Sequence, residues 1–262
     1  MDIWRLLPFE THSAAWNMAI DEAIFQARIA EKTPNTLRLY RWSPSAVSIG
    51  RNENIDDRVY LQNARQLEVD VIRRCSGGGT VYHDCHGEVT YSVVAKTSDL
   101  GSPSDVTCVY FKIYEAITDA LRLLGLSADF NNGNTKNCPN LTVRGKKISG
   151  SSQTLSRGYV LQHGTLLQNV NLDKMFQLLK LKDLSCTQAA DFGREKITSI
   201  QNELQHYVSS DTISNALKQG FKATLKIQLK EAPLTPFEEA LADKLYKEKY
   251  STNTWTFSGK LA

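Results

Sequence analysis

The chain has 262 residues, enough for one large domain or two small ones, and 41% of them are hydrophobic while 23% are charged. These proportions are typical of a folded globular protein rather than a disordered one. Lys and Arg number 31 and Asp and Glu 28, giving a formal charge of +3. That balance, without the basic clusters that phosphate-rich partners require, argues against nucleic acid and against a membrane surface as partners.

The cysteines and the N-terminal segment indicate the cellular compartment in which we expect the protein. The five cysteines, at positions 75, 85, 108, 138 and 186, are odd in number and have no CxxC spacing. This pattern argues against a disulfide framework and a zinc site, so no metal-ligating residues are predicted. No stretch approaches the ~18 consecutive apolar residues of a membrane span, and residues 1–16 lack the apolar core of a secretory signal. We therefore expect a cytoplasmic protein with reduced thiols.

The first hundred residues predict one helix followed by strands. Residues 14–30 carry apolar side chains at helical spacing, and Ser13 before them is a good N-cap. Further along, β-branched and aromatic residues are bounded by turn residues, among them Ser43-Pro44-Ser45. The predicted strands in this part are residues 36–42, 45–50, Val69–Arg74 and Glu88–Lys96.

The remainder of the chain adds two clear helices and three strands. Residues 105–124 follow a period of 3.6 and are followed by Gly125 as a C-cap. Thr235-Pro236-Phe237-Glu238 has the pattern of a capping box and predicts a helix to about Tyr250. Because most strands fall between residues 36 and 170, we predict an α+β fold with a mostly antiparallel sheet flanked by helices. The additional strands are Leu141–Val143 and Lys147–Gly150, around an Arg144-Gly145 turn, and Val160–Leu167.

The run RRCSGGGTVYHD, residues 73–84, is the most informative segment. Three successive glycines after a strand let the backbone approach a ligand and present several N–H groups to an anion. The two arginines offer bidentate donors to a phosphate or carboxylate. The alternative is a glycine-rich hairpin with solvated arginines. The run matches neither a P-loop nor a dinucleotide fingerprint, so it indicates an anion without identifying it.

A second run, VRGKKISGSSQ, contains a lysine suited to acyl or phosphoryl chemistry. Strand alternation predicts Lys147, Ser149 and Ser151 on one face and Ile148 and Gly150 on the other. A lysine that points into a sheet-lined pocket can polarise a carbonyl or neutralise a phosphate. The alternative is a hairpin whose lysines are simply solvated.

A third run, QHGTLL, places the imidazole of His163 among apolar strand residues. A satisfied core histidine is the commoner explanation for such a position. None of the three runs identifies a chemistry by itself.

Taken together and in this order, the three runs resemble the lipoate–protein ligase and octanoyltransferase family, which shares its catalytic fold with biotin–protein ligases. The resemblance extends to Asn17–Ala23, Arg41–Asn52 and Lys249–Trp255, so it covers nearly the whole chain. It implies a single catalytic domain over residues 1–262. Bacterial ligases usually carry an additional C-terminal accessory domain, which we do not expect within these 262 residues. A separate accessory ligase subunit is therefore one possible partner.

The resemblance implies an enzyme that attaches a lipoyl or octanoyl chain to a lysine of a carrier. In the ligases, ATP and Mg²⁺ activate lipoate to an acyl-adenylate before transfer. The carriers are lipoyl domains of 2-oxoacid dehydrogenases and the H protein of glycine cleavage.

The resemblance also assigns residues to roles. Lys147 matches the lysine that contacts the activated carbonyl and the phosphate, and Arg74 matches the arginine near the nucleotide phosphates. His83 matches a position that shapes the loop rather than one that performs acid–base chemistry. The other residues predicted to bind nucleotide or acyl group are Ser76, Gly77, Gly78, Gly79, Thr80, Val81, Tyr82, Ser149, Gly150 and His163.

Cys138, nine residues before Lys147, leaves a second reaction open. Octanoyltransferases take the acyl group from acyl carrier protein onto a cysteine in the loop before the lysine strand, and need neither ATP nor Mg²⁺. A thiolate beside Lys147 would be activated electrostatically. We favour the ligase because the unbroken Gly77-Gly78-Gly79 is the part that must admit a nucleotide. A non-catalytic acyl-binding module is a further alternative, against which the presence of both Arg74 and Lys147 argues, and a biotin ligase is less favoured.

Overall fold

A large mixed sheet runs through the centre of the protein in this computed structural model, which describes residues 2–101, 106–131 and 139–261. The pairs from β3 through β7, β11, β10 and β9 to β8 are antiparallel, whereas β12, β1 and β2 join by parallel pairing. The prediction of a mostly antiparallel α+β fold is therefore confirmed, and the parallel edge is an addition to it. In spatial order the strands are β12 (Gln228–Glu231), β1 (Ile3–Leu6), β3 (Thr36–Trp42), β7 (Glu88–Lys96), β11 (Tyr159–Leu167), β10 (Lys146–Ser156), β9 (Asn140–Val143) and β8 (Asp129–Asn131), with β2 (Glu10–His12) beside β3.

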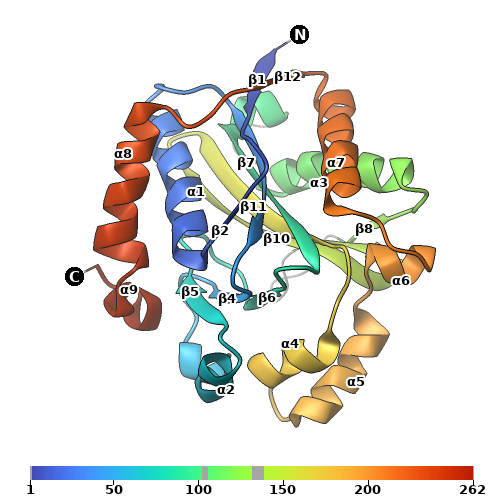
Figure 1. Cartoon of the computed structure of the whole chain (residues 1–262). Helices are drawn as coiled ribbons and strands as arrows, with labels where there is room; N and C mark the ends of the chain where they lie inside the picture. Colours follow the sequence, from blue (N-terminus) through green and yellow to red (C-terminus); the bar gives the residue numbers. More distant parts are fainter. Residues whose placement is uncertain (1, 102–105, 132–138, 262) are drawn as a thin grey trace.

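Helices cover both faces of the large sheet (Figure 1). On one face lie α1 (Ala14–Ile29) and α8 (Pro236–Leu245), and on the other α3 (Val106–Leu123) and α7 (Ser210–Leu225). Strand β7 contributes side chains to the cores on both faces of the sheet, because successive side chains of a strand point in opposite directions. Val93 packs into the core shared with α3 and α7, and the next residue, Val94, packs against α1.

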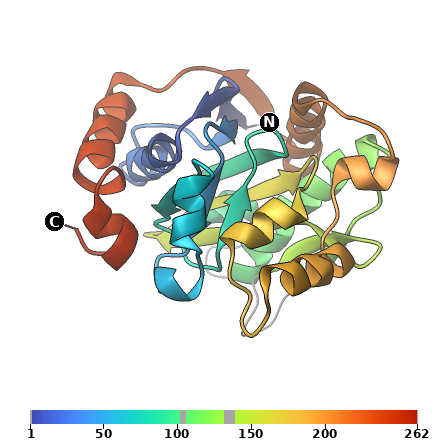
Figure 2. The same ribbon diagram turned by 60° about the horizontal axis from the view of Figure 1, so that its bottom comes forward.

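A small second sheet forms a separate layer at one end of the large one (Figures 1 and 2). The strands predicted at residues 36–42 and 45–50, on either side of one turn, are found at 36–42 and 46–49. They do not pair with each other, because the turn carries the chain from the large sheet to the small one. The small sheet contains β5 (Asp70–Arg73), β4 (Ala46–Ile49) and β6 (Val81–His83), and α2 (Leu61–Gln66), α4 (Leu172–Leu178) and α5 (Cys186–Lys196) share its core. The remaining helices are α6 (Ile200–Leu204) and α9 (Asn253–Ser258), with 3-10 turns at Ile55–Asp57 and Thr97–Leu100 and a π-helical turn at Tyr246–Tyr250.

The local signals predicted from the sequence hold in the structure. The Ser13 side chain accepts a hydrogen bond from the Trp16 amide, and Thr235 with Glu238 forms the capping box of α8. Gly125 has a φ of 87° after α3, as a glycine C-cap requires. None of the helices in the described ranges is long and apolar enough to cross a bilayer.

Candidate active site

A cavity of about 720 Å³ is lined by residues of both sheets. We call the part lined by buried residues of β3, β6, β7 and β11 its inner end, and the part lined by the exposed residues Gly78, Gly79 and Lys147 its mouth. The structure thus brings most of the predicted binding residues to one cavity. Those on its wall are Arg74, Gly78, Gly79, Thr80, Val81, His83, Lys147, Gly150 and His163.

Other predicted site residues lie behind this wall. Tyr82 packs into the core of the small sheet and donates a hydrogen bond to Asp84. Ser149 is fully buried on the core side of β10, where its hydroxyl lies 3.5 Å from that of Tyr91. Ser76 is fully buried beside Ser152 and His163, and the Gly77 carbonyl accepts a hydrogen bond from Arg74. Cys138 lies outside the described residues, although the next residue, Pro139, lines the cavity.

Arg74 holds the glycine run in place. Its Nη1 donates to the carbonyl and hydroxyl of Ser48, and its Nη2 donates to the carbonyls of Gly77 and Gly79 at 2.9 and 2.7 Å. The neighbouring Arg73 is also buried, and it donates to backbone carbonyls that include those of Trp255 and Gly50. Neither arginine is solvated, so the alternative of a hairpin with solvated arginines is wrong. A guanidinium with several fixed donors is well suited to holding carbonyls that would otherwise be unpaired.

A close backbone approach fixes the loop on its other side. A Cβ added to Gly50 would lie 1.9 Å from the carbonyl oxygen of Gly78, so a residue with a side chain at position 50 cannot coexist with this loop. Gly78 itself has a φ of 83°, a conformation that glycine adopts without strain. Thr80 donates to Glu53 at 2.6 Å and so ties the end of the run to the cavity mouth. The glycine run is therefore preorganised, as a loop that receives a ligand should be.

Lys147 reaches the cavity because β10 is irregular. The pairing of β10 with β9 shifts between Lys147 and Ser149, which is the signature of a bulge. As a result the Lys147 ammonium lies beside Gly150, where an added Cβ would be 2.7 Å from Nζ. The prediction that Lys147 shares a face with Ser149 is wrong, because the extra residue reverses the alternation on which it rested. A hydrogen bond from the Thr198 amide to the Lys147 carbonyl, 2.9 Å, holds the bulge.

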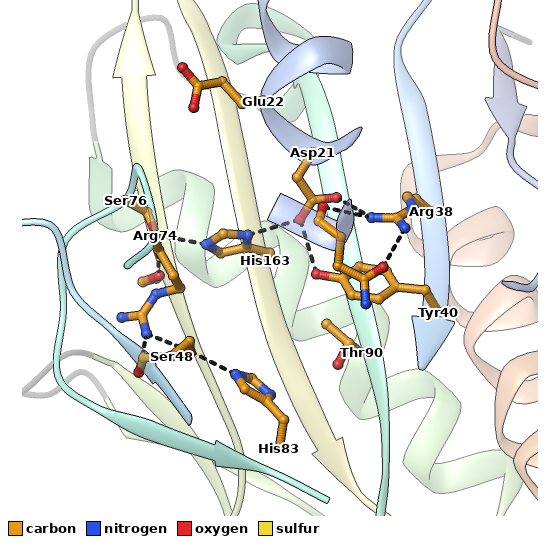
Figure 3. A network of polar contacts seen from close by, with 12 residues as sticks. Asp21, Glu22, Arg38, Tyr40, Ser48, Arg74, Ser76, His83, Thr90 and His163 are labelled. Carbon is orange, nitrogen blue, oxygen red and sulfur yellow. Dashed lines mark hydrogen bonds and ion pairs between the residues drawn. The ribbon is translucent and has the colours of Figure 1, made fainter. Parts of the chain in front are cut away.

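His163 is part of a buried polar network (Figure 3). Its Nδ1 lies 3.0 Å from Oδ2 of Asp21, and its Nε2 lies 2.6 Å from Oγ of Ser76. Asp21 on α1 also accepts hydrogen bonds from Arg38 at 2.8 Å and from Tyr40 at 3.0 Å. The histidine is thus both a satisfied core residue and part of the cavity wall.

A second network of the same design surrounds His83 (Figure 3). Nε2 of His83 lies 2.7 Å from Oγ of Ser48, and its Nδ1 lies 2.7 Å from Oε1 of Glu88. Thr90 donates to the same Glu88 oxygen, and the ring of His83 stacks on Trp42 with centroids 4.0 Å apart. Each histidine therefore joins a serine to a buried carboxylate, which fixes its ring and its tautomer.

Burial and the neighbouring charges together set the protonation of the first network. Burial lowers the pKa of His163, and the hydrogen bond and charge of Asp21 only partly oppose this effect. For Asp21, burial raises the pKa, but the His163 hydrogen bond and the Arg38 charge outweigh it and the pKa falls below 3.8. The network therefore contains a neutral imidazole and an ionised carboxylate at neutral pH.

These shifts predict that the protein is destabilised by mild acid. Because the pKa of His163 is lower in the folded state than the 6.5 of a free histidine, the unfolded chain binds a proton that the folded chain does not. Stability should consequently fall as the pH drops below 6.5, and Asp21 should add a further loss below 3.8. Urea unfolding between pH 7.5 and 5 measures the first step. His163→Gln should reduce that pH dependence, the exposed control His206→Gln should leave it unchanged, and equal slopes in both variants would contradict the assignment.

Of the cysteines in the described ranges, none lines the cavity. Burial raises the pKa of the Cys75 thiol to about 12, with the Glu22 charge adding to the effect, so this thiol is a poor nucleophile at neutral pH. Cys85, Cys108 and Cys186 are partly buried elsewhere. A thiol mechanism in this protein would therefore depend on Cys138.

Comparisons with known proteins agree with this geometry. Residues 13–222 match the lipoyl protein ligase A/B catalytic domain family. The octanoyltransferase LipM of Brevibacillus brevis is 33% identical over 97% of this chain and 99% of its own length. The octanoyltransferase LipM of Clostridioides difficile is 31% identical over 97% of this chain and 98% of its own length.

Solved structures give the same result. A bipartite lipoate protein ligase of Thermoplasma acidophilum, studied with its E2 lipoyl domain, is 31% identical with a TM-score of 0.86, over 98% of this chain and 97% of that one. Lipoate-protein ligase A bound with ATP is also 31% identical with a TM-score of 0.86, over 98% of this chain and 99% of that one. The chain belongs to the lipoyl protein ligase A/B catalytic domain family and is an enzyme of the lipoate ligase and octanoyltransferase class.

Proposed function

We propose that the protein is a lipoate–protein ligase, which activates lipoate or octanoate with ATP and transfers the acyl group to a lysine of a lipoyl carrier. One observation carries the proposal: the Lys147 ammonium and the preorganised glycine run line the same cavity. A cation and a row of backbone amides stabilise the negative charge that develops on an acyl carbonyl and on an adenylate phosphate.

The cavity is larger than an acyl chain alone requires. At roughly 30 Å³ per non-hydrogen atom, the share of one water molecule in the liquid, an eight-carbon acyl group of about ten such atoms fills roughly 300 Å³. More than half of the 720 Å³ then remains for a second group, enough for about fourteen such atoms, so the rest of a nucleotide would extend out through the mouth. We place the acyl chain at the buried inner end, where each buried methylene contributes about 0.8 kcal/mol, and the nucleotide at the open mouth beside Lys147 and Gly79.

The residues present offer little for a resident metal. Among the described residues there is no group of three His, Cys, Asp or Glu side chains that could hold one. Glu53 is the carboxylate of the described cavity wall, and it is already engaged by Thr80 and Arg58. Mg²⁺ is commonly held by substrate phosphates, waters and one or two carboxylates, so in this proposal it would enter with ATP.

A lipoyl domain or a glycine cleavage H protein would be the acyl acceptor. The Thermoplasma acidophilum protein is a bipartite lipoate protein ligase that was studied together with its E2 lipoyl domain. This supports a separate accessory subunit as a possible partner here, supplied in trans for the activation step.

The curated relatives support a second candidate function. Since they are octanoyltransferases, octanoyl transfer from acyl carrier protein through a thioester on Cys138 is the alternative, and it needs neither ATP nor Mg²⁺. Replacing Cys138 with serine separates the two routes, because adenylation needs no thiol.

Intact mass spectrometry of a lipoyl carrier domain tests both candidates. One reaction contains the protein, lipoate, ATP and Mg²⁺, and the other contains octanoyl-acyl carrier protein without ATP. Modification in the first, retained by Cys138→Ser, supports the ligase. Modification confined to the second, with an octanoyl adduct on Cys138, supports the octanoyltransferase instead. No modification in either, even after addition of an accessory subunit, would refute acyl transfer to this carrier.

A further inference from the structure

A chain of hydrogen bonds leads from the cavity wall into the core of the protein. It begins at Ser152 of β10, which lines the cavity and whose Oγ lies 2.8 Å from Oγ of Ser76. Ser76 is fully buried and continues the chain to Nε2 of His163 at 2.6 Å. The chain ends at Asp21, 3.0 Å from Nδ1 of the same ring (Figure 3). Three parts of the sequence that lie far apart thus form one continuous path.

The donor and the acceptor of each hydrogen bond in this path can be deduced, starting from Asp21. Ionised Asp21 can only accept, so Nδ1 of His163 carries the proton between them. A neutral ring then has a lone pair on Nε2, which accepts the hydroxyl proton of Ser76. Because that hydroxyl has one proton, Ser152 must donate to Ser76. All donors point inward, as in a path that accepts a proton at the cavity and delivers it to the imidazole.

The path starts close to the cation of the proposed site. Gly150, against which the Lys147 ammonium lies, and Ser152 are two residues apart on β10 and both line the cavity. Two residues along a strand correspond to about 7 Å. An acyl group whose carbonyl lies near Lys147 would thus share the cavity with the hydroxyl that begins the path.

We propose that His163 accepts, through Ser76 and Ser152, the proton that the attacking amine loses during acyl transfer. This role rests on the proposed function. When the carrier lysine attacks as a free amine, the C–N bond forms and the bond to the leaving group breaks, with its electron pair leaving on the phosphate. The nitrogen keeps one proton in the amide. The other passes to Ser152, the proton of Ser152 passes to Ser76, and that of Ser76 passes to Nε2 of His163.

The surroundings of His163 keep its ring neutral at pH 7 and hold a carboxylate ready to stabilise the imidazolium. Asp21, from α1, stabilises the imidazolium by its charge and its hydrogen bond. Two groups act against it: the Arg74 guanidinium after β5 and the His83 ring on β6. Beyond Asp21, the Arg38 guanidinium and Tyr40 hydroxyl of β3 hold the carboxylate in place. General bases of this kind typically contribute 10²–10⁴-fold to a rate.

The second network provides a matched control within the same molecule. His83 also joins a serine to a carboxylate, but Ser48 accepts a hydrogen bond from Nη1 of Arg74 at 2.8 Å. A guanidinium does not give up a proton at ordinary pH. In this second path the Ser48 hydroxyl receives its hydrogen bond from a permanent cation, whereas the Ser76 hydroxyl receives its hydrogen bond from a second hydroxyl that can relay a proton. His83 is therefore the control, although Ser48 and His83 also line the cavity.

The test is the pH profile of single-turnover acyl transfer to the carrier, started from preformed acyl donor. The attacking lysine must be a free amine, so in every variant the rate falls about tenfold per pH unit below the lysine pKa. For the wild type we expect a steeper fall in acid, because His163 becomes protonated as well. Ser76→Ala and His163→Gln should lower the neutral-pH rate by at least ~10-fold and lose this additional fall, with acyl binding retained. Ser152→Thr should restore what Ser152→Ala loses. His83→Gln should keep the additional fall whatever its overall rate, and an additional fall that persists in Ser76→Ala and His163→Gln would overturn the proposal.

A measurement independent of turnover tests the path directly. In ¹⁵N-histidine NMR at pH 7, His163 should be a neutral ring protonated at Nδ1, with Nε2 as acceptor. A ring protonated at Nε2 in an otherwise active enzyme would refute the path and leave the proposed function intact. A wild-type protein inactive with both acyl donors would refute the proposed function, and the role of His163 in it.

Discussion

Replacement of Lys147 with alanine should lower the rate of acyl transfer by about 10²–10³-fold, the size of effect expected when one preorganised electrostatic group is lost. The ammonium is the cation that β10 places at the cavity mouth, beside the backbone of Gly150. Since the side chain is exposed, its loss should leave the fold intact. Acyl binding should survive in part, because the buried inner end of the cavity is unchanged. Carrier modification followed by mass spectrometry measures the rate, and calorimetry measures acyl binding.

Lys146 is the matched control for this prediction. It precedes Lys147 in the same hairpin, but its Nζ donates to the carbonyl of Arg194 at 2.7 Å and it is not part of the cavity wall. Lys146→Ala removes the same charge from the same strand and should keep the wild-type rate within a few-fold. Wild-type turnover in Lys147→Ala, or equal losses in both variants, would sink the assignment of Lys147.

The fold could be predicted where the pattern was strong and local. The bounds of β3 and β7 agree with the predicted residues 36–42 and 88–96, and the N-cap of α1 and the capping box of α8 were also predictable. The parallel pairing of β12, β1 and β3 at one edge of the large sheet could not be predicted. Strand β12 has four residues that are mostly exposed, so its sequence has no alternation to detect, and its partner β1 lies more than 200 residues away.

The candidate site was predictable as a set of segments but not as a geometry. The motifs identified the glycine run and the lysine strand, yet a bulge of one residue reversed the predicted face of Lys147. The carboxylates behind the two histidines were missed as well. A signal for them exists: Glu88 is a charged residue at the start of an almost entirely buried strand, and Asp21 lies four residues after Asn17 on the same buried face of α1. Buried charges of this kind need partners, and the two histidines are those partners.

Gly150 provides the second large expected effect. An added Cβ would lie 2.6 Å from Cε and 2.7 Å from Nζ of Lys147, so Gly150→Ala should push the ammonium out of its position. The displaced atoms belong to the end of a flexible side chain, and alanine is preferred to glycine in a strand by about 0.5–1 kcal/mol. We therefore expect normal stability but a rate reduced by up to about 10²-fold, the cost of misplacing a catalytic group by about 1 Å.

A double-mutant cycle separates this positioning effect from any general disturbance of the strand. If Gly150 acts through Lys147, adding Gly150→Ala to Lys147→Ala should cause almost no further loss, because the ammonium that it displaces is already absent. Gly164→Ala is the contrasting variant. Its added Cβ would lie 2.5 Å from the Gly150 carbonyl oxygen, from Cβ of Ser151 and from the Tyr91 hydroxyl, and none of these can move freely. That variant should lose stability in urea unfolding, whereas Gly150→Ala should lose rate alone. Additive losses in the cycle would mean that the glycine at position 150 serves the strand and not the lysine.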